Sequence, residues 1–274
     1  MITMPLAGLA ARTSATLRIT MINLRGQAEF RANFIASILL GALWQTSIVV
    51  FAAVLLTHFR SIGGWSSASV LLLAAMRLTS HAVTTLLSGR INYISRIIQE
   101  GRIDTYLVRP TSVYRQIQFY AFGANAFGDL AVALTMLVIA IAAFDQPWTF
   151  ARVVLLLAGI VGGALMETAV MIVLAGWAIL RPHAASWAFR FQELLDTVGN
   201  YPLTILPRSV QALLTIIPVA FIAYLPAAAI TGHAETTGLP DWLVWGSPLA
   251  GLIGYGIART VFQACINRYQ GSND

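Results

Sequence analysis

The chain has 274 residues, of which 58% are hydrophobic and only 10% are charged, and its formal net charge is +6. Soluble domains average about 25% charged residues, so this composition indicates a membrane protein. All 17 basic residues are arginines, and the absence of lysine excludes a Walker A phosphate loop and Schiff-base chemistry.

Cysteine and histidine are too few and too scattered to indicate a metal site. Cys265 is the single cysteine, which excludes an internal disulfide and a site with several thiolate ligands. The histidines lack the spacing of metal ligands, since they stand at His58, His81, His183 and His233. No metal or cofactor is therefore expected in this chain.

Residues 17–30 are expected to form a short amphipathic helix before the first membrane span. Leu17, Met21 and Leu24 recur at helical spacing on one face, whereas arginines fall on another. Such a helix is predicted to lie in the inner interface of the membrane. A solvated N-terminal helix is the alternative.

Six segments are long and apolar enough to cross a bilayer, which takes about 20 residues in a helix. The predicted fold is an all-α membrane protein, with residues 1–274 forming a single transmembrane domain. The six predicted spans cover residues 34–56, 65–87, 117–143, 152–180, 209–231 and 241–264. Pro218 and Pro226 are expected to kink or interrupt the fifth of these spans.

The arginines indicate how the predicted spans are oriented. Fourteen arginines fall on one side of the six spans, whereas Arg60 and Arg152 fall on the other and Arg77 lies within a span. Basic residues are retained on the cytoplasmic side, so both termini are predicted to be cytoplasmic. Nucleic acid is not an expected partner, because the positive charge follows the membrane topology. No signal peptide is expected, because the first apolar run is too short for one.

The loop between the second and third spans, residues 88–115, is the most distinctive stretch of the chain. Isoleucines recur at helical spacing up to Ile98, and Gly101 is a suitable residue to end a helix. Asp104 is expected to cap a second short turn, which Pro110 ends. The pattern predicts a short amphipathic helix on the cytoplasmic surface followed by a charged corner. A solvated positive loop is the alternative.

Arg77, Asp129 and Glu167 lie well inside predicted spans. Each is about 15–18 Å from its cytoplasmic end at the helical rise, which places all three near the middle of the bilayer. An isolated charge there costs several kcal/mol, so we expect Arg77 to pair with Asp129 or Glu167. The pair would either clamp helices together or line a substrate path. His81, one turn after Arg77, is expected to pack, and extension of the charge network is the alternative.

Two further features concern the helices themselves. The small residues at Gly159 and Gly163 form a close-packing motif, for internal packing or for a subunit interface.

Residues 184–210 mix Arg190, Glu193 and other charged residues with apolar ones, and are too polar to span freely. This segment is predicted to be an interfacial helix followed by a break.

Three stretches resemble ABC-2 type permeases, the membrane subunits of bacterial ABC exporters. The first runs from Ile98 to Pro110 and contains Gly-Arg-Ile-Asp-Thr-Tyr-Leu-Val-Arg-Pro. The second comprises residues 201–207 and 217–226, and the third is Asn-Arg-Tyr-Gln-Gly at residues 267–271. The six spans and cytoplasmic termini of that family agree with the topology predicted above, so the resemblance covers nearly the whole chain.

The resemblance implies a permease that moves a hydrophobic or amphipathic substrate, such as a drug, an antibiotic or a lipid, out across the cytoplasmic membrane of a bacterium. It implies no ATPase site in this chain, two copies of a separate ATPase subunit that bind ATP and Mg, and a second permease chain, identical or paralogous. The loop would carry a coupling helix that docks on the ATPase. The expected coupling residues are Ile98, Gly101, Arg102, Asp104, Leu107, Arg109 and Pro110.

Two other functions are compatible with the composition. An ion-coupled secondary transporter would use Arg77, Asp129 and Glu167, although the inverted repeats typical of such carriers are not evident. A membrane enzyme or a scaffold is the third possibility. No catalytic constellation of nucleophile, base and acid is apparent in the sequence, which disfavours the enzyme.

Overall fold

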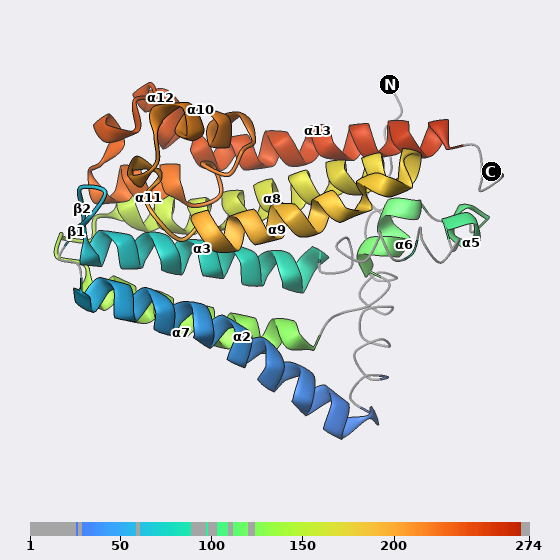
Figure 1. Cartoon of the computed structure of the whole chain (residues 1–274), viewed down its shortest axis with the longest axis horizontal. Coiled ribbons are helices and arrows are strands. Elements are labelled where there is room, and N and C mark those ends of the chain that lie inside the picture. The colour runs from blue at the N-terminus through green and yellow to red at the C-terminus, as the bar shows by residue number, and fades with distance from the viewer. Residues whose placement is uncertain are drawn as a thin grey trace.

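The chain was analysed as a computed structural model, which describes residues 26, 29–58, 61–88, 97, 103–108, 112–119 and 124–269. Long helices run along the longest axis of the molecule and form a bundle (Figure 1). Within the described residues, five helices are long and apolar enough to cross a membrane: α2 (Arg31–His58), α3 (Ser67–Ser88), α7 (Asn125–Ala143), α8 (Phe150–Leu180) and α13 (Ser247–Arg268).

Shorter elements fill the two ends of the bundle. The hairpin of β1 (Ser61–Ile62) and β2 (Trp65–Ser66) joins α2 to α3, and Gly63 and Gly64 take the positive φ angles that its tight turn requires. The other elements are α5 (Ile103–Leu107), α6 (Val113–Phe119), η2 (Pro182–Ala184), α9 (Ala185–Val198), η3 (Leu203–Ile205), α10 (Arg208–Ile216), α11 (Tyr224–Thr231), η4 (Ala234–Thr237) and α12 (Asp241–Trp245).

The long helices pack in the order α2, α7, α3, α8 and α13. Small residues allow the closest approaches, because a helix without side chains at the contact lets a neighbouring backbone come near. Gly128 of α7 faces the backbone of α2 at Ile38, and Gly162 of α8 faces Gly251 of α13. The predicted packing motif is used inside the molecule, since Gly163 faces the backbone of Ile222.

Five predicted spans coincide with long helices, but the third is shorter than expected. The segment predicted over residues 117–143 is divided, because residues up to Phe119 belong to α6 and α7 begins only at Asn125. Apolar residues continue across both helices, so hydropathy alone does not show the interruption. The amphipathic helix predicted for residues 17–30 lies largely outside the described residues.

The segment predicted as the fifth span, residues 209–231, is not one helix. The helix α10 ends at Ile216, and Ile217, which precedes Pro218, has an extended backbone because a residue before proline is disfavoured in helical conformation. Pro226 stands in the first turn of α11, where its missing N–H is tolerated. Trp65 of the hairpin stacks on Tyr224 and on His233, with ring centroids 5.6 Å and 4.6 Å apart. This segment therefore folds at the hairpin end of the bundle.

The helix α9 packs against the long helices of the bundle. It lies along α3 and α8 (Figure 1), and Thr204, just after it, donates a hydrogen bond of 2.7 Å to the Gly63 carbonyl in the hairpin turn. The segment after α8 thus returns through the bundle to the hairpin end. This differs from the interfacial helix expected for residues 184–210. Phe191 and Leu195 are buried in the bundle, and charged partners offset the cost of burying its polar residues.

Candidate coupling segment and intramembrane charge network

The short helices α5 and α6 lie at the end of the bundle opposite the hairpin, near the end of α13 (Figure 1). Two side chains of α5, Ile103 and Tyr106, are buried and fix this helix to the bundle. The Gln116 side chain of α6 donates a hydrogen bond of 2.8 Å to the Tyr106 carbonyl. The two helices are therefore joined to each other as well as to the bundle.

A tyrosine pair attaches α6 to α13. The hydroxyls of Tyr114 and Tyr255 share a hydrogen bond of 2.8 Å, and the Tyr114 ring meets Phe262 edge to face with centroids 5.8 Å apart. The guanidinium carbon of Arg259 lies 5.0 Å from the centre of the Tyr114 ring, within the range of a cation–π contact. Burial and the bond to Tyr255 raise the pKa of Tyr114 well above its usual value.

A second link joins α5 to the residue that follows α13. Tyr269 makes a side-chain hydrogen bond with Asp104, in the first turn of α5. Burial, together with the nearby Asp104 carboxylate and this bond, raises the pKa of the Tyr269 phenol above 10.0. The sequence predicted Asp104 as a helix cap and as a coupling residue, but it gave no signal for the contact with Tyr269, because the two residues are far apart in the chain.

The coupling residues expected from the sequence are only partly described. Asp104 and Leu107 belong to α5, whereas Ile98, Gly101, Arg102, Arg109 and Pro110 lie outside the described residues. Leu107 is 40% exposed and the next residue, Val108, is 84% exposed. This end of the bundle therefore presents apolar side chains beside Asp104.

A buried ion pair lies deeper, between α3 and α8. Arg77 Nη1 is 3.5 Å from Glu167 Oε2, and the two side chains are 2% and 0% exposed. Asp129, the other partner considered for Arg77, lies elsewhere. Its carboxylate accepts a hydrogen bond of 3.4 Å from Asn125 on the same helix and lies against Gly41 of α2.

Three more side chains complete the charge network around Glu167. His81 Nδ1 lies 2.7 Å from Glu167 Oε1, so His81 does not simply pack, as the sequence had suggested. Gln192 of α9 donates a hydrogen bond of 3.1 Å to the same oxygen, and Asp196 Oδ1 lies 3.7 Å from Arg77 Nη2. The network therefore ties three helices together: α3, α8 and α9.

The two α9 residues of this network were not predicted as site residues. Gln192 and Asp196 are separated by four positions, which puts them on one face of a helix. That spacing is the signal that sequence analysis had available. Their partners lie on helices more than twenty residues away in the chain, so the spacing alone does not identify them.

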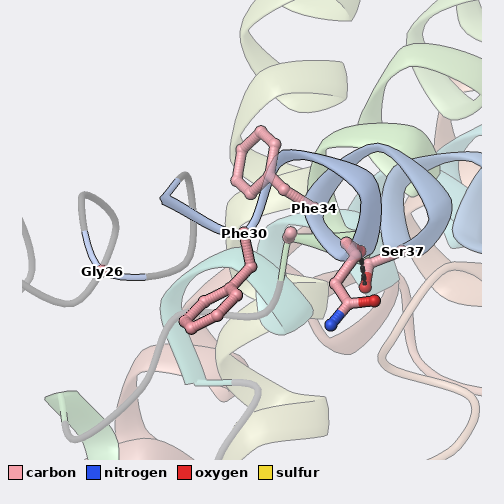
Figure 2. Close-up of a pocket in the computed structure, with 6 residues that line it drawn as sticks. Gly26, Phe30, Phe34 and Ser37 are labelled. Atoms are coloured by element: carbon pink, nitrogen blue, oxygen red, sulfur yellow. Dashed lines mark hydrogen bonds between the residues drawn. The ribbon is translucent and has the colours of Figure 1, made fainter.

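Two open hollows are lined by described residues. The larger, with a volume of about 560 Å³, lies between α2 and the end of α9 and is bordered by Asp196 and Asn200. The smaller, of about 220 Å³, lies at the start of α2, where Figure 2 shows Phe30 and Phe34 with Ser37 one turn later. No group of three or more histidine, cysteine and acidic side chains within the described ranges is placed to hold a metal ion.

The structure is that of a multi-pass membrane protein. Long apolar helices surround a buried charge network, and short helices are attached to one end of the bundle. A family model described as ABC-2 family transporter protein matches residues 42–273, and the chain belongs to this family. ABC-2 permeases are membrane subunits that lack an ATPase site of their own and generally work with an ATPase subunit. No curated protein and no solved structure gives a significant match to the chain.

Proposed function

We propose that this chain is the transmembrane permease of an ATP-driven exporter in the cytoplasmic membrane of a bacterium. It moves a hydrophobic or amphipathic substrate, and a separate ATPase subunit in two copies binds ATP and Mg. A second permease chain, identical or paralogous, completes the assembly. The family match over residues 42–273 is the observation that carries this proposal. The absence of lysine supports it, because a Walker A loop requires one.

The α5 region is the proposed docking surface for the ATPase. Leu107 and Val108 expose apolar area at the end of the bundle where Asp104 also lies. Exposed apolar residues rimmed by charge are typical of protein interaction sites. The neighbouring Arg102 and Arg109 supply that charge in the sequence.

The hydrogen bonds of this region provide a physical route from the docking surface to the bundle. Motion of α5 reaches α13 through the bonds of Asp104 to Tyr269 and of Tyr114 to Tyr255. The helix α13 packs closely on α8 where Gly162 faces Gly251, and α8 carries Glu167. ATP drives the transport cycle by binding one state of the assembly more tightly than the other.

Co-purification is the direct test of the proposed function. The permease is co-expressed with the products of neighbouring genes, purified in nanodiscs and analysed by mass spectrometry. A stoichiometric ATPase supports the proposal, and the stoichiometry shows whether one or two kinds of permease are present. A stable oligomer without an ATPase would contradict it and would favour an ion-coupled carrier built on Arg77 and Glu167.

The coupling role of the loop is tested in the assembled complex. We expect the double variant Asp104→Ala/Arg109→Ala to hydrolyse ATP without transporting substrate, while the permease remains folded. Substrate flux into inverted vesicles and phosphate release are measured on the same preparation. Normal transport by this variant would show that the loop does not couple the two processes.

A further inference from the structure

The larger hollow lies between α2 and the end of α9. Ser47 and Ile48 of α2 form one side, and Asp196 and Thr197 of α9 form the other. Its volume of about 560 Å³ lies within the range of roughly 300–1,000 Å³ that small-molecule sites occupy. The contact of Asp196 with Arg77, ten residues along α3, places this α2–α9 cleft partway along the length of the bundle, where it opens to the surface beside Ser47 and Thr197.

Asn200 supplies an unfilled hydrogen-bond acceptor at this cleft. The side chain is 3% exposed and borders the cleft. Its Nδ2 donates a hydrogen bond of 3.1 Å to the Asp196 carbonyl, which fixes the orientation of the amide. No donor in the described part of the chain reaches Asn200 Oδ1. A buried acceptor of this kind costs free energy until a donor occupies it.

Asp196 adds an incompletely compensated negative charge on the same side. Arg77 is closer to Glu167 than to Asp196, at 3.5 Å against 3.7 Å, so one guanidinium is shared by two carboxylates. His81 also contacts Glu167. The Asp196 side chain is 35% exposed and borders the cleft, whereas Glu167 is fully buried. The charge that the cleft presents to a ligand is therefore negative.

The hydroxyl groups of Ser47 on α2 and Thr197 on α9 do not make the cleft favourable for an anionic ligand. Ser47 already donates a hydrogen bond of 2.6 Å to the Trp44 carbonyl, and Thr197 donates one of 2.7 Å to the Glu193 carbonyl. Arg77 is too deeply buried to reach a ligand in the cleft. An anionic group would thus meet the Asp196 carboxylate and the Asn200 acceptor oxygen, with Tyr201 as the lining residue that still carries a donor, its phenol O–H. The carboxylate disfavours binding of an anion.

We propose that the α2–α9 cleft binds the ammonium group of a cationic amphipathic substrate, with Asp196 and Asn200 as its acceptors. Ile48, Tyr201 and Ile205 supply apolar contacts for the rest of the molecule. This inference names the substrate class of the proposed exporter and rests on that function. It concerns the permease alone, so it is tested without the ATPase.

The test uses three probes of the same shape and different charge. Phenylbutylammonium, phenylbutanol and phenylbutyrate are titrated against purified permease in nanodiscs, with binding followed by saturation-transfer NMR and empty nanodiscs subtracted. We expect the ammonium probe to bind about tenfold or more tightly than the alcohol, because a charged donor strengthens a hydrogen bond. The carboxylate probe should bind most weakly. Equal affinities for all three, or a preference for phenylbutyrate, would overturn the proposal.

Matched variants localise the binding. Asp196→Asn should weaken the ammonium probe about tenfold and leave the alcohol unchanged, because only the charged contact is lost. Glu193→Gln is the control, since Glu193 is an exposed carboxylate on α9 that does not border the cleft. Identical effects of the two variants on the ammonium probe would refute a site at Asp196.

A second variant decides the question if Asp196→Asn fails to fold. Asn200→Leu removes the unfilled acceptor and keeps the contact of Asp196 with Arg77. It should weaken the ammonium probe severalfold relative to the alcohol, and an unchanged ratio would overturn the proposed role of Asn200. If the chain does not bind an ATPase, the proposed exporter function is wrong, but the affinities of the three probes are unaffected. The failure of one proposal can therefore be distinguished from the failure of the other.

Discussion

Removing one member of the Arg77–Glu167 pair tests whether this contact clamps the bundle. Leaving one partner of a buried ion pair uncompensated costs about 3–5 kcal/mol. When Glu167 is removed, Asp196 still lies 3.7 Å from Arg77, but its side chain is 35% exposed and compensates the charge only in part. We therefore expect a cost at the lower end of that range. For a chain of this size, about 3 kcal/mol corresponds to a fall in Tm of roughly 6–12 °C. We expect Glu167→Met to show this fall, measured by thermal challenge and size-exclusion chromatography in detergent.

The double variant Arg77→Met/Glu167→Met supplies the control. Replacing a buried pair by apolar residues of similar size is often neutral, so the double variant should regain at least half of the lost Tm. Glu193→Gln, which changes an exposed carboxylate, should leave Tm unchanged. Additive losses from Arg77→Met and Glu167→Met would refute the reasoning, because additivity means that the two side chains do not interact.

Three further predictions concern the end of the bundle that carries α5 and the packing of the long helices. Tyr269→Phe removes the hydrogen bond to Asp104 and should lower transport per ATP hydrolysed with little change in Tm, as measured by paired flux and phosphate assays. Val108→Asp places a charge on the exposed docking surface and should weaken capture of the ATPase about tenfold or more in a pull-down, because a hot-spot contact carries about 2 kcal/mol; unchanged capture would exclude this surface. Gly163→Val inserts a side chain against the backbone at Ile222 and should abolish the monodisperse elution peak, whereas Gly256→Val, which meets open space, should preserve it.

The long helices and one contact of the charge network were both predictable from the spacing of apolar and charged residues along the chain. Long apolar segments and the depth of a charge within them can be read from residue spacing alone, which placed Arg77 at the level of Glu167 and Asp129. Depth does not specify rotation about the helix axis. The structure directs Glu167 toward α3 and Asp129 toward α2, and the sequence had no means of choosing between them.

The wrong prediction of one continuous helix over residues 209–231 has a different physical origin. Hydropathy treats each polar residue as a cost, so it rejected the stretch that contains Gln192 and Asp196 and preferred the more apolar residues 209–231. In the folded bundle those two side chains meet Glu167 and Arg77, which offsets the cost of their burial. Pro218 and Pro226 meanwhile divide the apolar stretch into short helices.

The position of α9 connects the charge network to the proposed transport path. One face of α9 holds Gln192 and Asp196 against α3 and α8, whereas Arg190, Glu193 and Thr197 are exposed. A helix at membrane depth with an exposed polar face is stable only if that face meets protein or water, because lipid cannot solvate it. We therefore expect the exposed face of α9 to meet either the second permease chain proposed above or an aqueous path. The α2–α9 cleft adjoins the same helix, which places the proposed ammonium site where a substrate moving along that face would meet it.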